Sequence, residues 1–165
     1  MNWIPILCSA LIPMAIGFIW YNPKIGFGNA WMKASGMTME MAKGANMAVV
    51  FGFSLLFAVM LALSLMPLVI HQAGLNSMLQ PMPGSTESAT DLNAVLTDLM
   101  AKYGTRYRTF KHGMLHGAIA SIFFVLPVIG TNALFERKGA KYIFIHVGFW
   151  FVSLMLMGGV ICAFG

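Results

Sequence analysis

The sequence predicts an all-α, polytopic membrane protein: an antiparallel bundle of four transmembrane helices, with one short amphipathic helix in the loop between helices two and three. Of its 165 residues, 59% are hydrophobic and only 9% are charged, and the mean hydropathy is +0.79. A soluble domain is about a quarter charged. Four apolar runs have the roughly 20 residues that cross a hydrocarbon core of about 30 Å. This length suits one transmembrane domain over residues 1–165.

The first apolar run predicts a helix over residues 2–22, with no charged side chain. It lacks the basic start of a signal peptide and has no small-residue cleavage site, so we expect a retained membrane helix. It ends in W-Y-N-P-K-I-G-F-G-N-A-W, from Trp20 to Trp31. Aromatic residues gather at membrane interfaces, and Pro23 ends the helix. This stretch therefore marks where the chain leaves the membrane.

The second helix is predicted over residues 39–66, after a connection that ends in Met37. Thr38 is a suitable N-cap, and Glu40 lies in the first turn, where a negative charge is favourable. The first one or two turns should lie among the lipid headgroups. Pro67 is expected near the end of the helix.

One long polar segment, residues 71–111, separates the second and third helices. Its first half contains Pro81, Pro83 and Gly84 and is predicted to be a loop. Its second half predicts an amphipathic helix that ends at Gly104, because apolar residues recur at helical spacing: Leu92, Val95, Leu96, Leu99 and Met100. Such a helix suits the bilayer surface or the mouth of the bundle.

Helices three and four are predicted over residues 112–135 and 142–164, with a basic turn between them. Small residues recur every four positions in the first and third helices, which allows close helix–helix approach; these are Ser9, Pro13, Gly17, Gly113, Gly117 and Ser121. The fourth helix is also rich in small residues.

The four helices place both termini and the long loop on one side. Six basic residues lie on the opposite side: Lys24, Lys33, Lys43, Arg137, Lys138 and Lys141. Four lie on the side of the termini: Lys102, Arg106, Arg108 and Lys111. Basic residues favour the cytoplasmic side, so the termini are predicted to be periplasmic.

Polar residues in membrane helices suggest function, and six interfacial residues lie at similar depth on the side opposite the termini. They are Trp20, Tyr21, Asn22, Asn132, Glu136 and His146. One interpretation is a pocket for a headgroup, an ion or a proton. The other, which we favour, is a hydrogen-bonded staple of the helix ends, since such bonds average about 0.6 kcal/mol in membranes.

Three histidines lie on the side of the termini: His71 after helix two, and His112 and His116 in helix three. The H-x-x-x-H spacing places two imidazoles on one helix face, which suits two metal ligands. The 15 methionines could suggest copper, but they are scattered as flexible packing residues. We expect these histidines to bond to backbone or headgroups, with no metal and no cofactor.

Other functional classes find little support. The two cysteines, Cys8 and Cys162, lie within apolar runs and imply no disulfide. No nucleophile elbow, phosphate-binding loop or H-E-x-x-H motif is present, so we expect no enzyme. The basic residues are spread over several loops, which argues against nucleic-acid binding.

Two motifs resemble a known family. The first motif is W-Y-N-P…F-G-N-A-W (Trp20–Trp31). The second is T-N-A-L-F-E-R-K (Thr131–Lys138), which is followed by the glycine-rich fourth helix. They are similar to stretches of small bacterial membrane proteins catalogued as domain of unknown function seventeen sixty-one. The resemblance implies four membrane helices and the bacterial inner membrane. It implies no activity.

The small-residue faces favour a non-enzymatic inner-membrane protein that contacts membrane lipids and self-associates as a homo-oligomer, or serves as an accessory subunit of an unidentified membrane protein. The alternative is an oligomeric transporter or channel for a small solute, ion or lipid that uses the polar residues near Asn132 and Glu136.

Overall fold

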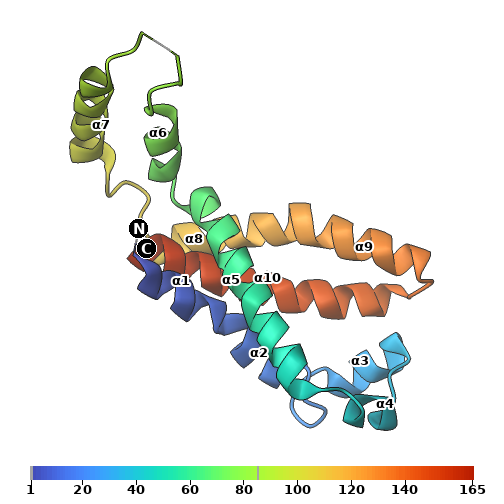
Figure 1. Ribbon diagram of the computed structural model, residues 1–165. Helices are drawn as coiled ribbons and strands as arrows, with labels where there is room; N and C mark the ends of the chain where they lie inside the picture. The colour runs from blue at the N-terminus through green and yellow to red at the C-terminus, as the bar shows by residue number, and fades with distance from the viewer. Residues whose placement is uncertain (1, 85) are drawn as a thin grey trace.

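The computed structural model describes residues 2–84 and 86–165, and every regular element within them is helical. Four helical segments are long and apolar enough to cross a membrane: Trp3–Trp20, Met47–Val69, Phe110–Phe135 and Ala140–Phe164. The predicted fold class is therefore confirmed. The termini lie together at one end of the molecule (Figure 1), where the Asn2 amide nitrogen is 3.5 Å from the Phe164 carbonyl oxygen.

The first span consists of two helices, α1 (Trp3–Ala10) and α2 (Ile12–Trp20), where the sequence predicted one. The break falls at Leu11, because Pro13 has no N–H to donate to the carbonyl four residues earlier. The two helices together still form a span of 18 residues.

The aromatic motif after α2 folds back onto the end of that helix. Phe27 N–H donates to the Trp20 carbonyl at 2.7 Å. A Cβ atom on Gly26 would lie 2.2 Å from the Ile19 carbonyl oxygen, and one on Gly28 would lie 2.3 Å from that of Tyr21. Only glycine permits this approach, which explains both glycines of the motif. The chain then forms α3 (Gly28–Ser35), which the sequence had placed in a connection.

The predicted second helix is divided into α4 (Met39–Lys43) and α5 (Met47–Val69). Thr38 caps α4 as predicted, accepting from Met41 N–H. A new helix begins at Met47 because the Asn46 side chain accepts two backbone N–H groups of its first turn. Helix α5 continues past Pro67 to Val69. Its C-terminal half is packed, whereas residues 47–54 are exposed.

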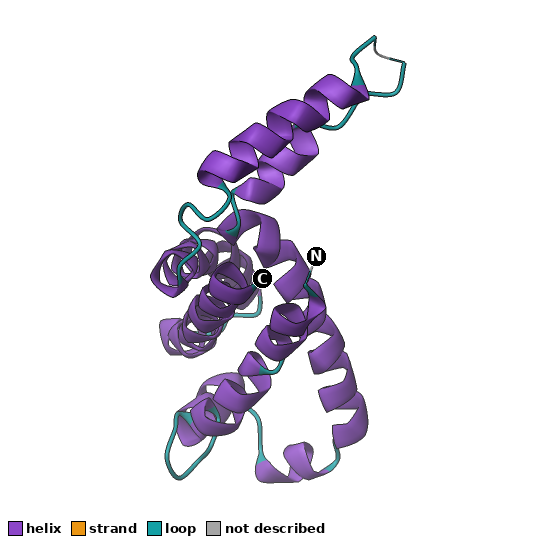
Figure 2. Cartoon of the chain, turned by 90° about the vertical axis from the view of Figure 1, so that its left-hand side faces the viewer, coloured by secondary structure: helices purple, strands orange, loops and turns teal. Residues whose placement is uncertain are grey.

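A helical hairpin follows, formed by α6 (Gln72–Met78) and the predicted amphipathic helix α7 (Ala89–Tyr103). Helix α6 was not predicted. The hairpin projects from the body of the molecule at the end that holds the termini (Figure 2). The Gln72 side chain fixes its base, because its Nε2 donates to the carbonyls of Tyr103 at 3.0 Å and Arg106 at 2.8 Å.

The third span runs through α8 (Phe110–Ala120), the π-helix η1 (Ser121–Val125) and α9 (Leu126–Phe135). Leu126 N–H donates to the Ser121 carbonyl, five residues back. This wider turn precedes Pro127, where the regular helical bond is missing. The fourth span is one helix, α10 (Ala140–Phe164).

Helix α10 is the centre of the fold and contacts all three other spans. Its approach to α8 is the closest, because a Cβ atom on Gly113 would lie 2.0 Å from the Gly158 carbonyl oxygen and one on Gly117 would lie 2.1 Å from that of Leu154. The small-residue row predicted as a packing face is thus used within the chain. The core lies on the termini side of the spans and includes Met157 and Ile161.

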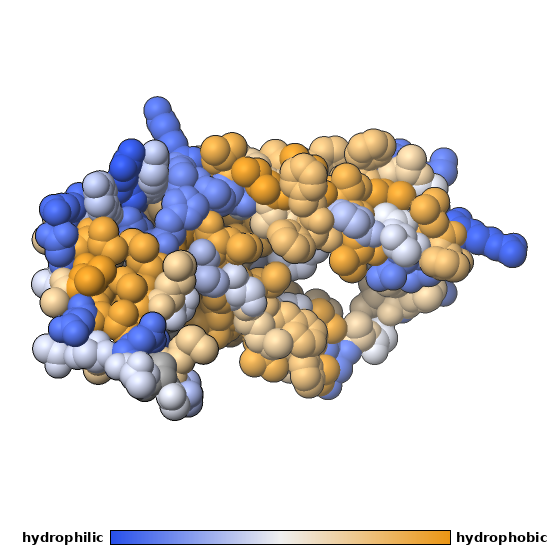
Figure 3. All heavy atoms as spheres, turned by 90° about the horizontal axis from the view of Figure 1, so that it is seen from above, coloured by the Kyte–Doolittle hydropathy of each residue, from blue (hydrophilic) through white to orange (hydrophobic). Residues whose placement is uncertain are grey.

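The outer surface suits a lipid environment. Apolar residues dominate the middle of the view in Figure 3, with hydrophilic residues at both ends. Large exposed apolar side chains occur on every span. In a bilayer these side chains meet lipid tails, so the protein is an integral membrane protein.

Candidate functional site

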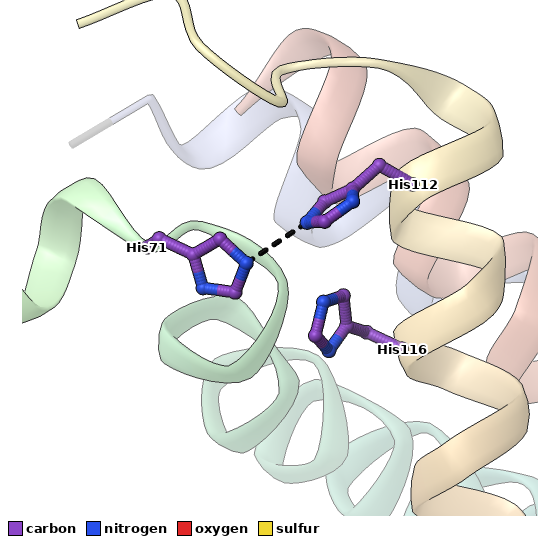
Figure 4. Close-up of side chains that lie close together, drawn as sticks. All are labelled: His71, His112 and His116. Atoms are coloured by element: carbon purple, nitrogen blue, oxygen red, sulfur yellow. Dashed lines mark hydrogen bonds between the residues drawn. The ribbon is translucent and has the colours of Figure 1, made fainter. Parts of the chain in front are cut away.

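Three histidines converge at the end of the molecule that holds the termini (Figure 4). The ring nitrogens that His71, His112 and His116 offer as ligands all lie within 4.8 Å of one another. The Nε2 atoms of His71 and His112 are 2.9 Å apart. Ring centroids are separated by 5.0 Å for His71–His112, 4.9 Å for His71–His116 and 4.5 Å for His112–His116. These residues are called the three-histidine site below.

Two separate elements supply the ligands. His71 lies between α5 and α6, immediately after the buried end of the second span. His112 and His116 lie one turn apart on α8, so their side chains share a face. Helix α8 begins before His112 because Thr109 Oγ1 accepts its N–H at 3.2 Å. The site therefore bridges the second and third spans.

The C-terminal end of α10 holds these elements together. The buried thiol of Cys162 lies 3.2 Å from the Val69 carbonyl and 3.3 Å from the Tyr107 carbonyl. Arg108 Nε donates to the Cys162 carbonyl at 2.9 Å, and its guanidinium also donates to the Gly165 carbonyl. These bonds tie the end of α5 and the loop before α8 to one helix terminus, which brings His71 beside His112.

Tyr107 forms one wall of the site. Its ring stacks on His112 at 5.1 Å with an interplanar angle of 21°, and it meets His71 edge-on at 6.3 Å. Its backbone φ is +63°, a left-handed conformation that is uncommon for a non-glycine residue. The bond from Cys162 to the Tyr107 carbonyl lies in this same turn.

The donor set determines what the site can bind. Imidazole nitrogens suit zinc, copper, iron and nickel. Nitrogens about 2.0–2.1 Å from a tetrahedral ion are about 3.4 Å apart. The ligand nitrogens, all within 4.8 Å of one another, reach that separation by small rotations of the exposed ring of His71 and the partly exposed rings of His112 and His116. Three protein ligands leave a coordination position open for water or another ligand. The arrangement can thus hold an ion and still admit a further group.

The sequence predicted bonds from these histidines to backbone or headgroups. The structure pairs the side chains of His71 and His112 with each other, and bonds to headgroups stay a prediction. The H-x-x-x-H spacing identified two members of the site, and the shared side of the membrane indicated the third. The roles of Tyr107, Arg108 and Cys162 carried no sequence signal, because they depend on where the end of α10 lies.

At the opposite end, part of the predicted polar cluster assembles. Tyr21 Oη lies 3.1 Å from His146 Nδ1, and Trp20 Nε1 donates to the Ile145 carbonyl at 3.0 Å. Burial, with a smaller contribution from Tyr142, raises the pKa of Tyr21 far above its ordinary value. The two side chains share one hydrogen bond, and the remaining ring nitrogen of His146 is Nε2. That atom is buried and has no partner among the described residues.

The other predicted members do not join them through side-chain bonds. Asn22 accepts from Lys24 N–H at 2.8 Å and shapes the turn. Asn132 and Glu136 are both exposed, at the end of α9 and at its C-cap. Neither side chain bonds to another described residue in this region. The staple between spans one and four consists of Trp20, Tyr21 and α10.

An apolar groove of about 540 Å³ lies beside this staple, lined by Trp20, Phe27, Lys141, Phe144, Ile145 and Gly148. Gly148 makes room for the indole, since a Cβ atom there would lie 2.9 Å from the Trp20 ring. Lys141 is its one charged wall residue, so the groove offers few polar groups compared with the three-histidine site.

Comparison with known proteins gives a family without an assigned role. A family model described as a protein of unknown function (DUF1761) matches residues 4–162. No curated protein and no solved structure shows significant similarity to the chain.

Proposed function

The chain belongs to the DUF1761 family of proteins of unknown function, and from its geometry we propose that it is a membrane protein that binds a transition-metal ion through His71, His112 and His116. The single observation that supports this is the convergence of three imidazoles within 4.8 Å, one from just after the second span and two from the third span.

Binding or transfer of the ion is proposed rather than catalysis. The potential ligand group contains imidazoles only, with no carboxylate among the described residues that form it. A general base beside the ion would ordinarily be a carboxylate or a further histidine. The three-histidine site therefore suits a protein that holds, senses or passes on a metal ion.

We further propose that the site faces the periplasm of a bacterial inner membrane. What supports this is the excess of basic residues at the other end of the bundle, six against four, because such residues favour the cytoplasm. A C-terminal alkaline phosphatase fusion should be active, and a C-terminal green fluorescent protein fusion should be dark. The reverse result would place the site in the cytoplasm.

Self-association is also proposed, through the N-terminal half of α5. The glycines of α8 are used against α10, whereas the large apolar residues at the start of α5 remain exposed, among them Phe51 and Phe53. Native mass spectrometry in mild detergent should detect a dimer or higher oligomer. A monomer at all concentrations would remove this proposal and leave metal binding untouched.

The metal proposal is tested on protein purified without a histidine tag. Isothermal titration with Zn²⁺ and Co²⁺ should give one ion per chain. His71→Ala, His112→Ala and His116→Ala should each lower the affinity at least ten-fold. His146→Gln is the matched control, since it removes the fourth histidine of the chain at the opposite membrane end, and it should bind like the wild type. Equal affinity in all five proteins would overturn the proposal.

A further inference from the structure

A groove of about 290 Å³ opens beside the three-histidine site, lined by His71, Gln72, Leu75, Tyr103, Arg106 and Tyr107. Its lining residues belong to the start of α6, the end of α7 and the turn after α7, so the groove lies at the base of the α6–α7 hairpin. His71 belongs both to the groove and to the ligand set. A ligand in the groove is therefore adjacent to the position of a bound ion.

Arg106 gives the groove a fixed positive charge. Its guanidinium lies 5.7 Å from the Tyr103 ring centroid and 5.2 Å from that of Tyr107. Cation–π contact with both rings restricts the side chain. No ion pair joins Arg106 to another residue of the described ranges. Its charge is thus available to an anion.

Gln72 supplies a second polar group. The residue is only 8% exposed. Its Nε2 is held by the carbonyls of Tyr103 and Arg106, which fixes the amide orientation. Its Oε1 is buried and has no partner among the described residues. A buried acceptor without a donor costs free energy, so this atom favours a ligand that carries an O–H group.

We propose that this groove binds a phosphate group that retains one proton, with an oxygen on the open position of the metal ion. Arg106 pairs with the charge, as guanidinium groups do with phosphate, and the remaining P–OH donates to Gln72 Oε1. The group comes from inorganic phosphate or from the headgroup of a lipid monoester such as phosphatidic acid. This inference rests on the proposed metal binding, because one contact is made through the ion.

Co²⁺ provides the test, since its visible absorption reports the ligands around it. Full-length protein in detergent is loaded with Co²⁺ and freed of excess metal, and sodium phosphate is then added at pH 7. The spectrum of the wild type should change and saturate. Arg106→Gln should still bind Co²⁺ but need at least ten-fold more phosphate. Lys111→Gln is the charge-matched control, since Lys111 is exposed on α8 and does not line the groove, and it should respond like the wild type.

Two further arms identify the ligand. Sulfate has a similar shape but no O–H at this pH, so it should act at least ten-fold more weakly than phosphate. The second arm uses Co²⁺-loaded protein in phosphatidylcholine nanodiscs. If the lipid is the source of the phosphate group, the spectrum should change when phosphatidic acid is included. If inorganic phosphate is the source, the spectrum should change only when free phosphate is added.

The outcomes separate the two proposals. A wild type that binds no Co²⁺ overturns the metal site and this inference together. A wild type that binds Co²⁺ with a spectrum insensitive to both phosphate and phosphatidic acid overturns this inference alone. An equal response in Arg106→Gln, or to sulfate, does the same.

Discussion

The Nε2 atoms of His71 and His112 lie 2.9 Å apart, although 41 positions of sequence and a projecting helical hairpin separate the two residues. Their proximity follows from the end of α10, where the Cys162 thiol contacts the carbonyls of Val69 and Tyr107. Val69 lies two residues before His71, and Tyr107 lies five before His112. The ligands thus come from two spans but are positioned by a third.

Metal binding should stabilise the fold because the ion joins the second and third spans. A ligand present at 100 times its dissociation constant adds about 2.7 kcal/mol to the free energy of unfolding, or roughly 5–10 °C in Tm for a chain of this size. We expect this shift on addition of Zn²⁺ to the wild type, measured by differential scanning fluorimetry in detergent. His71→Ala should lose it, since the bridge to α5 is then absent. Acidification should weaken the shift, because protons compete with the metal for the imidazole nitrogens.

Arg108 is predicted to be a positioning residue for the site. It contacts the carbonyls of Cys162 and Gly165 and is not a metal ligand. Arg108→Gln should lower Zn²⁺ affinity about ten-fold, the lower end of what outer-shell changes cost, while one ion still binds per chain. Calorimetric titration measures both quantities. Lys111→Gln is the control, and an unchanged affinity in Arg108→Gln would show that the loop holds its place without this contact.

Gly113 should be intolerant of any side chain. Its Cβ position lies 2.0 Å from the Gly158 carbonyl oxygen, so alanine must push α8 away from α10. Overpacking of this kind costs about 1–3 kcal/mol. Gly113→Ala should therefore lower the Tm in detergent. Gly130→Ala is the matched control on the same span, with nothing within 4 Å of its Cβ position, and it should be neutral or slightly stabilising. Equal effects would contradict the close approach of the two helices.

The fold was predictable from sequence to a large extent because length and hydropathy determine membrane spans. Local sequence patterns did not predict where those spans are interrupted. Asn46 divides the predicted second helix because its side chain captures two N–H groups. The break before α2 at Pro13 and the π-helix before Pro127 likewise depend on tertiary structure. Neighbouring groups determine how the chain compensates for the backbone hydrogen bond that proline cannot donate. Helix α6 is short and lacks a strong apolar period.

The candidate site was predictable only in part. The spacing of His112 and His116 is a local property of a helix, and it was recognised. The inclusion of His71 depends on tertiary packing at the end of α10. At the other end Asn132 and Glu136 are both exposed, on α9 and at its C-cap, while Tyr21 and His146 pair with each other. The glycine row was correctly identified as a packing face, but its partner is α10.

The bond between Tyr21 and His146 is predicted to be a structural staple between the first and fourth spans. Tyr21→Phe removes the hydroxyl that pairs with Nδ1 and leaves the imidazole unpaired in a half-buried position. Interhelical hydrogen bonds in membranes average about 0.6 kcal/mol, and leaving one partner unsatisfied costs about 1–3 kcal/mol. A double-mutant cycle with His146→Phe isolates the pair. The coupling free energy from unfolding in detergent should be about 0.6 kcal/mol, with Zn²⁺ affinity unchanged in all three variants. Zero coupling would reject the staple, and an altered Zn²⁺ affinity would mean that the two membrane ends communicate.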